Sequence, residues 1–338
     1  METYAGIDLH SSNNFVGVIN DKDKRLYGKR HCNRLEDVLR ALEPFKDSLQ
    51  GVVVESTFNW YWLVDGLQAH GYQVHLANPS AIKQYEGLKY TDDRWDSFWL
   101  AHMYRLNILA EGYIYPKQSR AVRDLLRRRL LFVRHRTAHI LSLQSMISRN
   151  LGFKMSNNAI KKLKPADVED LFHCADLVFM AQNSVAAIGF LKKIIKEIEK
   201  RVKSQLKLRK EFVMLVTIPG IGDILGLTIM LEVGDIARFA KVGDYSSYCR
   251  CVESKRLSNG KKKGENNKKN GNKYLAWAYV EAAQFARRFC VKAQSFYQSK
   301  EAKTNAIVAT KALSNKISRA SYYMMRDQVP FDEHKLFG

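Results

Sequence analysis

Four acidic residues in the first hundred positions have the spacing expected of carboxylates that together bind divalent cations. Asp8 follows the apolar run in "YAGIDLH" and Glu55 ends "GVVVES", and both runs are typical of buried strands. Asp93 and Asp96, in "TDDRWDSFW", are three residues apart, so a helix beginning there would put both on one face. Mg²⁺ prefers oxygen ligands and stabilises the attacking and leaving oxygens of phosphoryl transfer. The pattern therefore predicts chemistry on a phosphate that depends on Mg²⁺, for which Mn²⁺ could substitute.

Each acid also has an ordinary structural explanation. An aspartate after a strand is commonly a turn residue, and acids at 92–96 would suit a helix N-terminus. The adjacent Asp92 leaves open which acid begins the motif. We favour Asp93, because only it has the three-residue spacing to Asp96. The joint order of the four acids is what favours a metal site.

One serine stands out in the basic segment "RLSNGKKKGENNKKNGNKYLA", residues 256–276. Ser, Asn and Gly are common in solvated loops, so a loop beside a nucleic-acid-binding patch is the ordinary explanation. The alternative is that Ser258 is a nucleophile, which would need activation by a base or a metal. The four upstream carboxylates would hold that metal. Ser254 is a rival nucleophile, but it lacks the x-Gly that follows Ser258.

Basic residues form two groups that could bind nucleic acid, one on a long predicted helix and one around Ser258. Lysine and arginine hold phosphates without reading sequence, so these groups predict binding and not sequence choice. A solvated helix face is the commoner explanation of such a charge run. The predicted nucleic-acid-binding residues are Arg127, Arg128, Arg129, Lys255, Arg256, Lys261, Lys262, Lys263, Lys268, Lys269 and Lys273.

The hydrophobic pattern predicts three regions that would position these residues. Residues 1–115 alternate strand and helix signals, which predicts an α/β domain whose strand ends open onto a ligand crevice. Residues 116–212 are poor in Gly and Pro and predict long antiparallel helices, in part a coiled coil, over 119–151 and 184–212. Residues 213–338 predict a mostly helical domain around the basic segment.

A Pro-Gly-Ile-Gly sequence at 219–222 separates two apolar helical segments. It is typical of a helix–hairpin–helix turn, whose glycines bring backbone N–H groups close to a phosphate. A tight turn without a ligand would give the same sequence.

Composition favours a polyanionic partner. The 338 residues include 55 Lys and Arg against 34 Asp and Glu, a formal charge of +21, and nucleic acid is the first candidate to neutralise it. There is no run of about 18 apolar residues and no signal sequence, which argues against a membrane partner. The five cysteines are scattered and odd in number, which is typical of a reducing, cytoplasmic setting.

Together these residues resemble the insertion sequence 110 family of transposases, the DEDD transposases related to the Piv-type DNA invertases and recombinases. In the N-terminal part the resemblance rests on "GIDLH", "VVVESTFNWYWLVDGL", "ANPSAIKQY" and "DDRWDSFWLA". In the C-terminal part it rests on "IPGIG", "GDIARF", "SNGKKKG" and "KNGNKYLAWAYVEAA". It covers nearly the full length. Three positions depart from the family pattern, with Ser97 where alanine is common, Asp92 as an added acid beside Asp93, and Ser254 where proline is common.

The resemblance implies a RuvC-like, ribonuclease H-like domain, a coiled-coil middle and a C-terminal transposase domain. It makes Asp8, Glu55, Asp93 and Asp96 the metal-binding set, and Ser258 the nucleophile that forms a covalent phosphoserine link to DNA. It also implies a homo-oligomer, dimer or tetramer, in which one protomer's carboxylates face another's serine. Donor and target DNA would be bridged by a guide RNA in a prokaryotic cytoplasm, with action at the nucleoid.

Two other functions fit the same residues. One is a metal-dependent Holliday-junction endonuclease that uses water in place of Ser258, and the other is a non-catalytic nucleic-acid-binding protein.

Overall fold

A computed structural model of the chain describes residues 1–82, 92–205, 210–254, 256–264 and 270–337. The chain separates into two compact units, residues 1–117 and 118–338. Each unit has its own hydrophobic core. The division into three domains at 116 and 213 stays a prediction.

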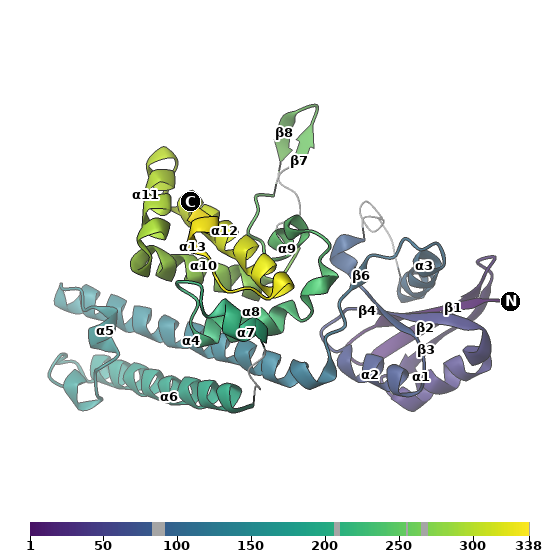
Figure 1. Cartoon of the computed structure of the whole chain (residues 1–338). Helices are drawn as coiled ribbons and strands as arrows, with labels where there is room; N and C mark the ends of the chain where they lie inside the picture. Colours follow the sequence, from purple (N-terminus) through teal and green to yellow (C-terminus); the bar gives the residue numbers. More distant parts are fainter. Residues whose placement is uncertain (83–91, 206–209, 255, 265–269, 338) are drawn as a thin grey trace. The chain divides into compact units, whose positions relative to one another are not determined.

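The first unit is a mixed six-stranded sheet in the order β3-β2-β1-β4-β5-β6, with helices on both faces (Figure 1). Strands β1 to β3 are antiparallel, β1, β4 and β5 are parallel, and β6 is antiparallel to β5. Its elements are β1 (Thr3–Leu9), β2 (Asn13–Asn20), β3 (Arg25–Cys32), α1 (Leu35–Leu42), the 3₁₀ turn Glu43–Ser48, β4 (Leu49–Glu55), α2 (Tyr61–Ala69), β5 (Val74–Ala77), the 3₁₀ turn Pro79–Ala81, α3 (Asp93–Arg105) and β6 (Glu111–Gly112). The predicted α/β class is confirmed.

The two faces of the sheet follow from the alternation of side chains along each strand. On β1, Ala5, Ile7 and Leu9 join the buried cluster under α1 and α2. Gly6 and Asp8 lie on the opposite face, which α3 covers. The strand pattern therefore decides that the first predicted acid faces the helix carrying the last two.

A row of three glycines lets α3 approach the sheet closely. Gly6 pairs with Gly17, and Gly17 with Gly28, so the three lie side by side across β1, β2 and β3. A Cβ atom on Gly6 would lie 2.0 Å from the carbonyl oxygen of Ser97, and one on Gly28 would lie 2.8 Å from the Phe98 ring. No real Cβ tolerates a backbone atom at 2.0 Å, so the row fixes how close the helix lies.

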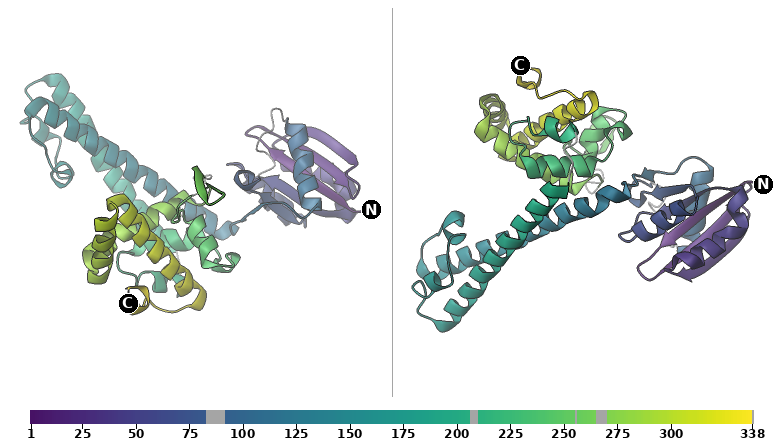
Figure 2. Two further views of the ribbon diagram at one scale, coloured as in Figure 1. Left: turned by 90° about the horizontal axis from the view of Figure 1, so that it is seen from above. Right: turned by 60° about the horizontal axis from the view of Figure 1, so that its bottom comes forward.

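The second unit is mostly helical, as predicted. Its elements are α4 (Lys117–Leu151), α5 (Asn157–Ile160), the 3₁₀ turn Ala166–Val168, α6 (Ala175–Gln205), α7 (Lys210–Leu215), α8 (Asp223–Val233), the 3₁₀ turn Ile236–Arg238, α9 (Val242–Tyr248), β7 (Arg256–Ser258), β8 (Lys261–Gly264), α10 (Lys273–Phe289), α11 (Val291–Lys303), α12 (Ala306–Asp327) and α13 (Glu333–Phe337). Helix α6 begins nine residues before its predicted start and its described part ends at Gln205. Most of α6 runs beside α4, and an ion pair of 2.6 Å joins Arg129 to Glu199 (Figures 1 and 2).

Among the described residues, α6 alone is long and apolar enough to span a membrane by length and composition. The core helix of a protein that never meets a membrane can pass the same test. Helix α6 contributes Val185 and Ile188 to a buried cluster with Ile140 and Leu143 of α4. Its apolar residues are thus partly explained by packing within the unit.

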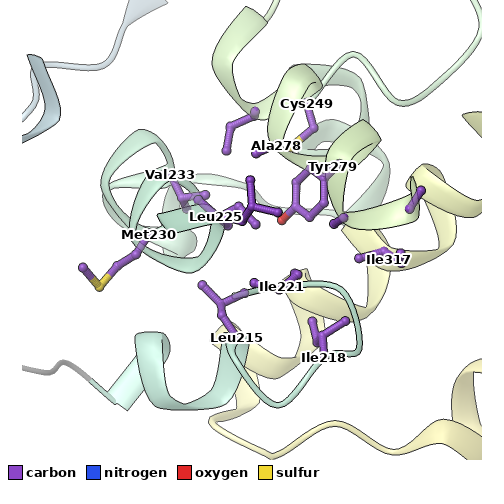
Figure 3. Packing of buried hydrophobic residues seen from close by; sticks show 14 of the residues in the cluster. Leu215, Ile218, Ile221, Leu225, Met230, Val233, Cys249, Ala278, Tyr279 and Ile317 are labelled. Atoms are coloured by element: carbon purple, nitrogen blue, oxygen red, sulfur yellow. The ribbon is translucent and has the colours of Figure 1, made fainter. Parts of the chain in front are cut away.

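The Pro-Gly-Ile-Gly turn lies between α7 and α8, as predicted, but it is a packing element. Ile218 and Ile221 point into the main core of the second unit (Figure 3). Gly220 has a φ of 94°, and a Cβ there would lie 2.3 Å from the carbonyl oxygen of Ala282 on α10. Contact with α10 therefore explains Gly220 without a phosphate.

We predict that Gly6→Ala destabilises the first unit by about 1–3 kcal/mol or more, because the added methyl group overpacks the contact with α3. The measurement is urea unfolding followed by circular dichroism. Gly112→Ala is the matched control, since the nearest atom to its added Cβ would be 3.4 Å away. Equal stability of the two variants would contradict the role of the glycine row.

Candidate metal centre and basic hairpin

Asp8 and Glu55 lie side by side at the carboxyl ends of two parallel strands. Ile7 of β1 pairs with Val54 of β4, so the residues that follow are neighbours on the face covered by α3. Asp8 is only 2% exposed. Glu55 is half-buried, and the neighbouring Asp8 carboxyl group helps to raise its pKa. Two of the four predicted acids are therefore neighbours that interact.

Helix α3 brings the other two acids to the same place. Asp92 is its N-cap, and its Oδ1 accepts a 2.7 Å hydrogen bond from the backbone N–H of Trp95. Asp93 and Asp96 are in the first turn. The geometry separates the two adjacent acids by role, since Asp92 satisfies the helix end and Asp93 faces Asp8.

His10 links the strand to the helix and was missed by the sequence analysis. Its Nε2 lies 3.1 Å from an oxygen of Asp8 and 3.1 Å from an oxygen of Asp93. The guanidinium of Arg30, on β3, contacts the other oxygen of Asp93 at 2.5 Å. His10 stands two residues after Asp8, so the alternation of side chains along a strand was a signal that could have found it.

Two asparagines hold the backbone of His10 in place, and neither was predicted. The side-chain amides of Asn33 and Asn59 each donate a 2.9 Å hydrogen bond to the carbonyl oxygen of His10. Asn33 in turn accepts a 3.1 Å hydrogen bond from Asn14, which is fully buried. These contacts fix the segment that follows β1 and with it the position of the imidazole.

The gathered carboxylates raise one another's proton affinity. Burial raises the pKa of Glu55 to about 8, and the hydrogen bond to Asp8 and the charges of Asp8 and Asp96 add to the shift. Burial also raises the pKa of Asp96 to about 6, with the charges of Asp8, Asp93 and Asp92 acting in the same direction and His10 opposing them. Glu55 therefore keeps its proton at neutral pH, chiefly because burial disfavours its charged form.

The donor set fits a divalent cation. Ligand atoms of Asp8, His10 and Asp93 all lie within 4.8 Å of one another. The shifted pKa values of Glu55 and Asp96 place these acids in the electrostatic field of the same group. Carboxylate oxygens suit Mg²⁺ and Mn²⁺, while imidazole nitrogen is more usual for transition metals such as Mn²⁺ than for Mg²⁺. The predicted ligand set of four acids thus gains His10 as a further candidate.

Ser258 lies in the second unit, at the end of β7. The segment predicted as a loop contains a hairpin, because β7 and β8 pair with Ser258 opposite Lys261. Asn259 and Gly260 form the turn with φ values of 50° and 71°, the Asn-Gly geometry of a two-residue hairpin. Ser258 is exposed beside this turn. Strands β7 and β8 form the hairpin seen in Figure 1, and the Ser-x-Gly motif places the serine next to its turn.

The chain segments before and after the hairpin, residues 248–250 and 270–272, are held together by hydrogen bonds. Arg250 donates hydrogen bonds to the carbonyl oxygens of Asn270 and Gly271 at 3.0 and 2.9 Å. The backbone N–H of Asn272 donates a 2.6 Å hydrogen bond to the carbonyl oxygen of Tyr248. A Cβ on Gly271 would lie 2.5 Å from that same oxygen. The segment that contains Ser258 thus begins and ends at two chain positions that are bonded to each other.

Two of the three helical arginines predicted to bind nucleic acid are engaged within the protein. Arg127 makes hydrogen bonds of 2.6 and 2.7 Å to Glu232, which is 2% exposed, and lies over the Tyr274 ring. Arg129 pairs with Glu199, whereas Arg128 is exposed. Packing and charge neutralisation explain Arg127 and Arg129 without a nucleic acid.

The lysines of the basic segment are only partly described. Lys261, Lys263 and Lys273 are exposed. Lys255, Lys268 and Lys269 lie outside the described residues, as do the side chains of Arg256 and Lys262. A role of these residues in binding nucleic acid stays a prediction.

Comparison with known families accounts for both units. Residues 5–150 match a family model described as a transposase, of the DEDD type named for IS110, and residues 213–298 match one described as "Transposase IS116/IS110/IS902 family". The chain belongs to the IS110 family of transposases. A comparison with curated protein sequences found no match. The family makes this transposase an enzyme that acts on DNA, and the predicted resemblance is confirmed.

We predict that Glu55→Gln stabilises the metal-free transposase at pH 8. The pKa of Glu55 rises from its ordinary value near 4.5 to about 8 on folding. Between these values the folded protein binds a proton that the unfolded chain has lost, so stability falls as pH rises. The amide cannot lose that proton. Thermal unfolding in EDTA should give a higher Tm for Glu55→Gln at pH 8 and nearly equal values at pH 5.

The control for this experiment is Glu36→Gln, on the exposed side of α1. It should change the Tm little at either pH. A wild-type protein that is as stable at pH 8 as at pH 5, with no gain from Glu55→Gln, would contradict the burial of a protonated glutamate.

Proposed function

We propose that this transposase is a Mg²⁺-dependent DNA recombinase that cleaves and exchanges strands through a covalent phosphoserine at Ser258. The observation that carries the proposal is the convergence of Asp8, His10 and Asp93, with Glu55 and Asp96 in the same electrostatic field. The strand order, an antiparallel hairpin of β1 to β3 followed by parallel β4 and β5, supports a RuvC-like, ribonuclease H-like fold for this unit.

The carboxylates and His10 would hold the metal, and Mn²⁺ would substitute for Mg²⁺. A bound divalent cation supplies positive charge that orients a phosphate and neutralises the charge developing on its oxygens. Glu55 would act as a ligand only in its ionised form. Arg30 and His10 contact the oxygens of Asp93 and so hold its carboxylate in position.

Ser258 would act as the nucleophile on a phosphodiester of DNA. Its Oγ forms a bond to phosphorus as the bond from phosphorus to the 3′ oxygen breaks. The hydroxyl of Ser258 loses its proton and the leaving 3′ oxygen gains one. Strand exchange reverses this step with a different 3′-hydroxyl, so the energy of the phosphodiester is kept and no nucleotide cofactor is needed. Exposure at the hairpin tip supports this role, since a DNA strand can reach the hydroxyl.

The partners proposed with this chemistry are donor DNA, target DNA and a guide RNA. The formal charge of +21 supports binding to several nucleic-acid strands, because each bound phosphate neutralises part of it. Among the predicted nucleic-acid-binding residues whose side chains are described, Arg128, Lys261, Lys263 and Lys273 are exposed and can therefore contact phosphates. A dimer or tetramer that acts on cytoplasmic DNA completes the proposal.

We predict that Ser258→Ala abolishes a covalent protein–DNA adduct. The wild-type transposase, incubated with Mg²⁺ and nicked DNA that carries its element's ends, should leave DNA attached to protein after denaturation. Ser254→Ala is the matched control, since it removes the rival hydroxyl four residues away, and it should keep the adduct. Free cleaved ends produced by Ser258→Ala at the wild-type rate would instead favour a nuclease that uses water.

We predict that Asp93→Asn loses cleavage by at least 100-fold, because a neutral amide binds Mg²⁺ poorly. Asp92→Asn should retain most activity, since asparagine caps a helix as well as aspartate does. The two variants make the same chemical change, aspartate to asparagine, at adjacent positions. The measurement is the cleavage rate over a titration of Mg²⁺ and Mn²⁺. Loss of activity in Asp92→Asn alone would reverse the assignment.

A further inference from the structure

Phe58 is a large apolar side chain that the first unit leaves open to solvent. It lies between Glu55, the last residue of β4, and Tyr61, the first residue of α2. Its exposed fraction of 84% is the highest of the large hydrophobic side chains that the structure describes. Single exposed apolar residues are common on protein surfaces, so exposure alone does not indicate a site. The position of Phe58 and the way its segment is held carry the inference.

The chain on both sides of Phe58 is fixed to the rest of the first unit. The backbone N–H of Ser56 donates a 3.1 Å hydrogen bond to the carbonyl oxygen of Ala77 on β5. The side chain of Asn59 donates a 2.9 Å hydrogen bond to the carbonyl oxygen of His10. Because its segment is already ordered, Phe58 loses little conformational freedom when a partner covers the ring.

The residues around Phe58 in the chain are polar or buried. Ser56, Thr57 and Asn59 are half-buried polar residues, and Trp60 is 8% exposed and belongs to the buried cluster under α1 and α2. Protein–protein interfaces have several apolar side chains packed together at their centre. A single ring among polar neighbours is better suited to a nucleic-acid base, which stacks on a ring face and keeps its polar edges in water.

Phe58 lies next to the proposed metal centre. Its Cα atom is at most about 11 Å from that of Glu55, the reach of three extended residues. The residue after it, Asn59, holds the backbone of His10, whose imidazole contacts Asp8 and Asp93. Successive nucleotides of a DNA strand are about 3.4 Å apart along the duplex axis. A base within a few nucleotides of a phosphate at the carboxylates can therefore reach the ring.

We propose that Phe58 stacks on an unpaired base of the DNA strand whose phosphate lies at the metal centre. A base inside a duplex has both faces covered by its neighbours, so the base that meets Phe58 is unstacked on at least one side. The stack holds the strand beside the carboxylates. The choice of strand rests on the proposed function, whereas the open ring and its fixed segment are independent of it.

The first test is the affinity of the full chain for a single-stranded DNA. The buffer contains Ca²⁺, which carboxylates also bind, in place of Mg²⁺ to limit cleavage. Phe58→Ala should weaken binding by about 5- to 150-fold, the range expected for one lost base stack. Phe58→Tyr keeps a ring and should bind as the wild type does. Phe58→Leu keeps an apolar side chain without a ring and should lose affinity as Phe58→Ala does.

The matched control is Phe153→Ala, which removes a 45% exposed ring from the second unit and should bind normally. Phe58 is exposed, so its variants should unfold at nearly the wild-type temperature. Wild-type affinity in Phe58→Ala, or in Phe58→Leu, overturns the proposal. So does a loss of affinity that is confined to an RNA of the same sequence. A change in oligomeric mass in Phe58→Ala, with DNA binding intact, would show that a second copy covers the ring and would also overturn it.

A single abasic site, moved along the same DNA, locates the stacked base. In the wild-type protein one position should weaken binding by about the same factor as Phe58→Ala, because each change removes one partner of the stack. In Phe58→Ala an abasic site at that position should cause no further loss, since the interaction is already absent. Equal losses in the two proteins at every position would overturn the proposal.

The covalent adduct at Ser258 separates this proposal from the proposed function. Wild-type affinity in Phe58→Ala, with the adduct formed by the wild-type protein, would overturn the base site and leave the recombinase mechanism standing. An abasic-site effect that depends on Phe58, in a wild-type protein that never forms an adduct, would support the base site and contradict the phosphoserine mechanism.

Discussion

The close packing of α3 on the row Gly6, Gly17 and Gly28 is the contact on which the metal centre depends. Because these three positions carry no Cβ atom, the helix can lie near enough for Asp93 to reach Asp8 and His10. Ser97 fits the same constraint. It is fully buried, and it differs from alanine only by a hydroxyl group, which donates to the carbonyl oxygen of Arg94. The departure from the family pattern at this position therefore preserves the packing.

The same contact has an electrostatic cost. Because the glycine row lets α3 pack closely on the sheet, the carboxylates lie together where little solvent reaches them. Burial and their mutual repulsion raise the pKa values of Glu55 and Asp96. Arg30 and His10 offset part of the repulsion at Asp93. A divalent cation would offset more of it. Active sites commonly sacrifice stability in this way, because the arrangement that binds a ligand is unfavourable without it.

The features that the sequence predicted are those encoded by short-range patterns of residues. Strand alternation and a three-residue helical spacing were enough to place Asp8, Glu55, Asp93 and Asp96 together. Strand β3 was missed because its exposed, basic residues lack an apolar pattern, and pairing with β2 at the sheet edge is what stabilises it. The hairpin at Ser258 carried an Asn-Gly turn signal, but the surrounding lysines are typical of a loop. Contacts between distant residues, such as Arg127 with Glu232, leave no trace in a single sequence.

The central claim is that Asp8, His10 and Asp93 bind one divalent cation. A crystal structure of the transposase soaked in Mn²⁺, with anomalous scattering recorded at the manganese absorption edge, tests it most directly. We predict one strong anomalous peak within coordinating distance of Asp8, His10 and Asp93. Fully occupied Mn²⁺ bound elsewhere, with no peak between β1 and α3, would contradict it.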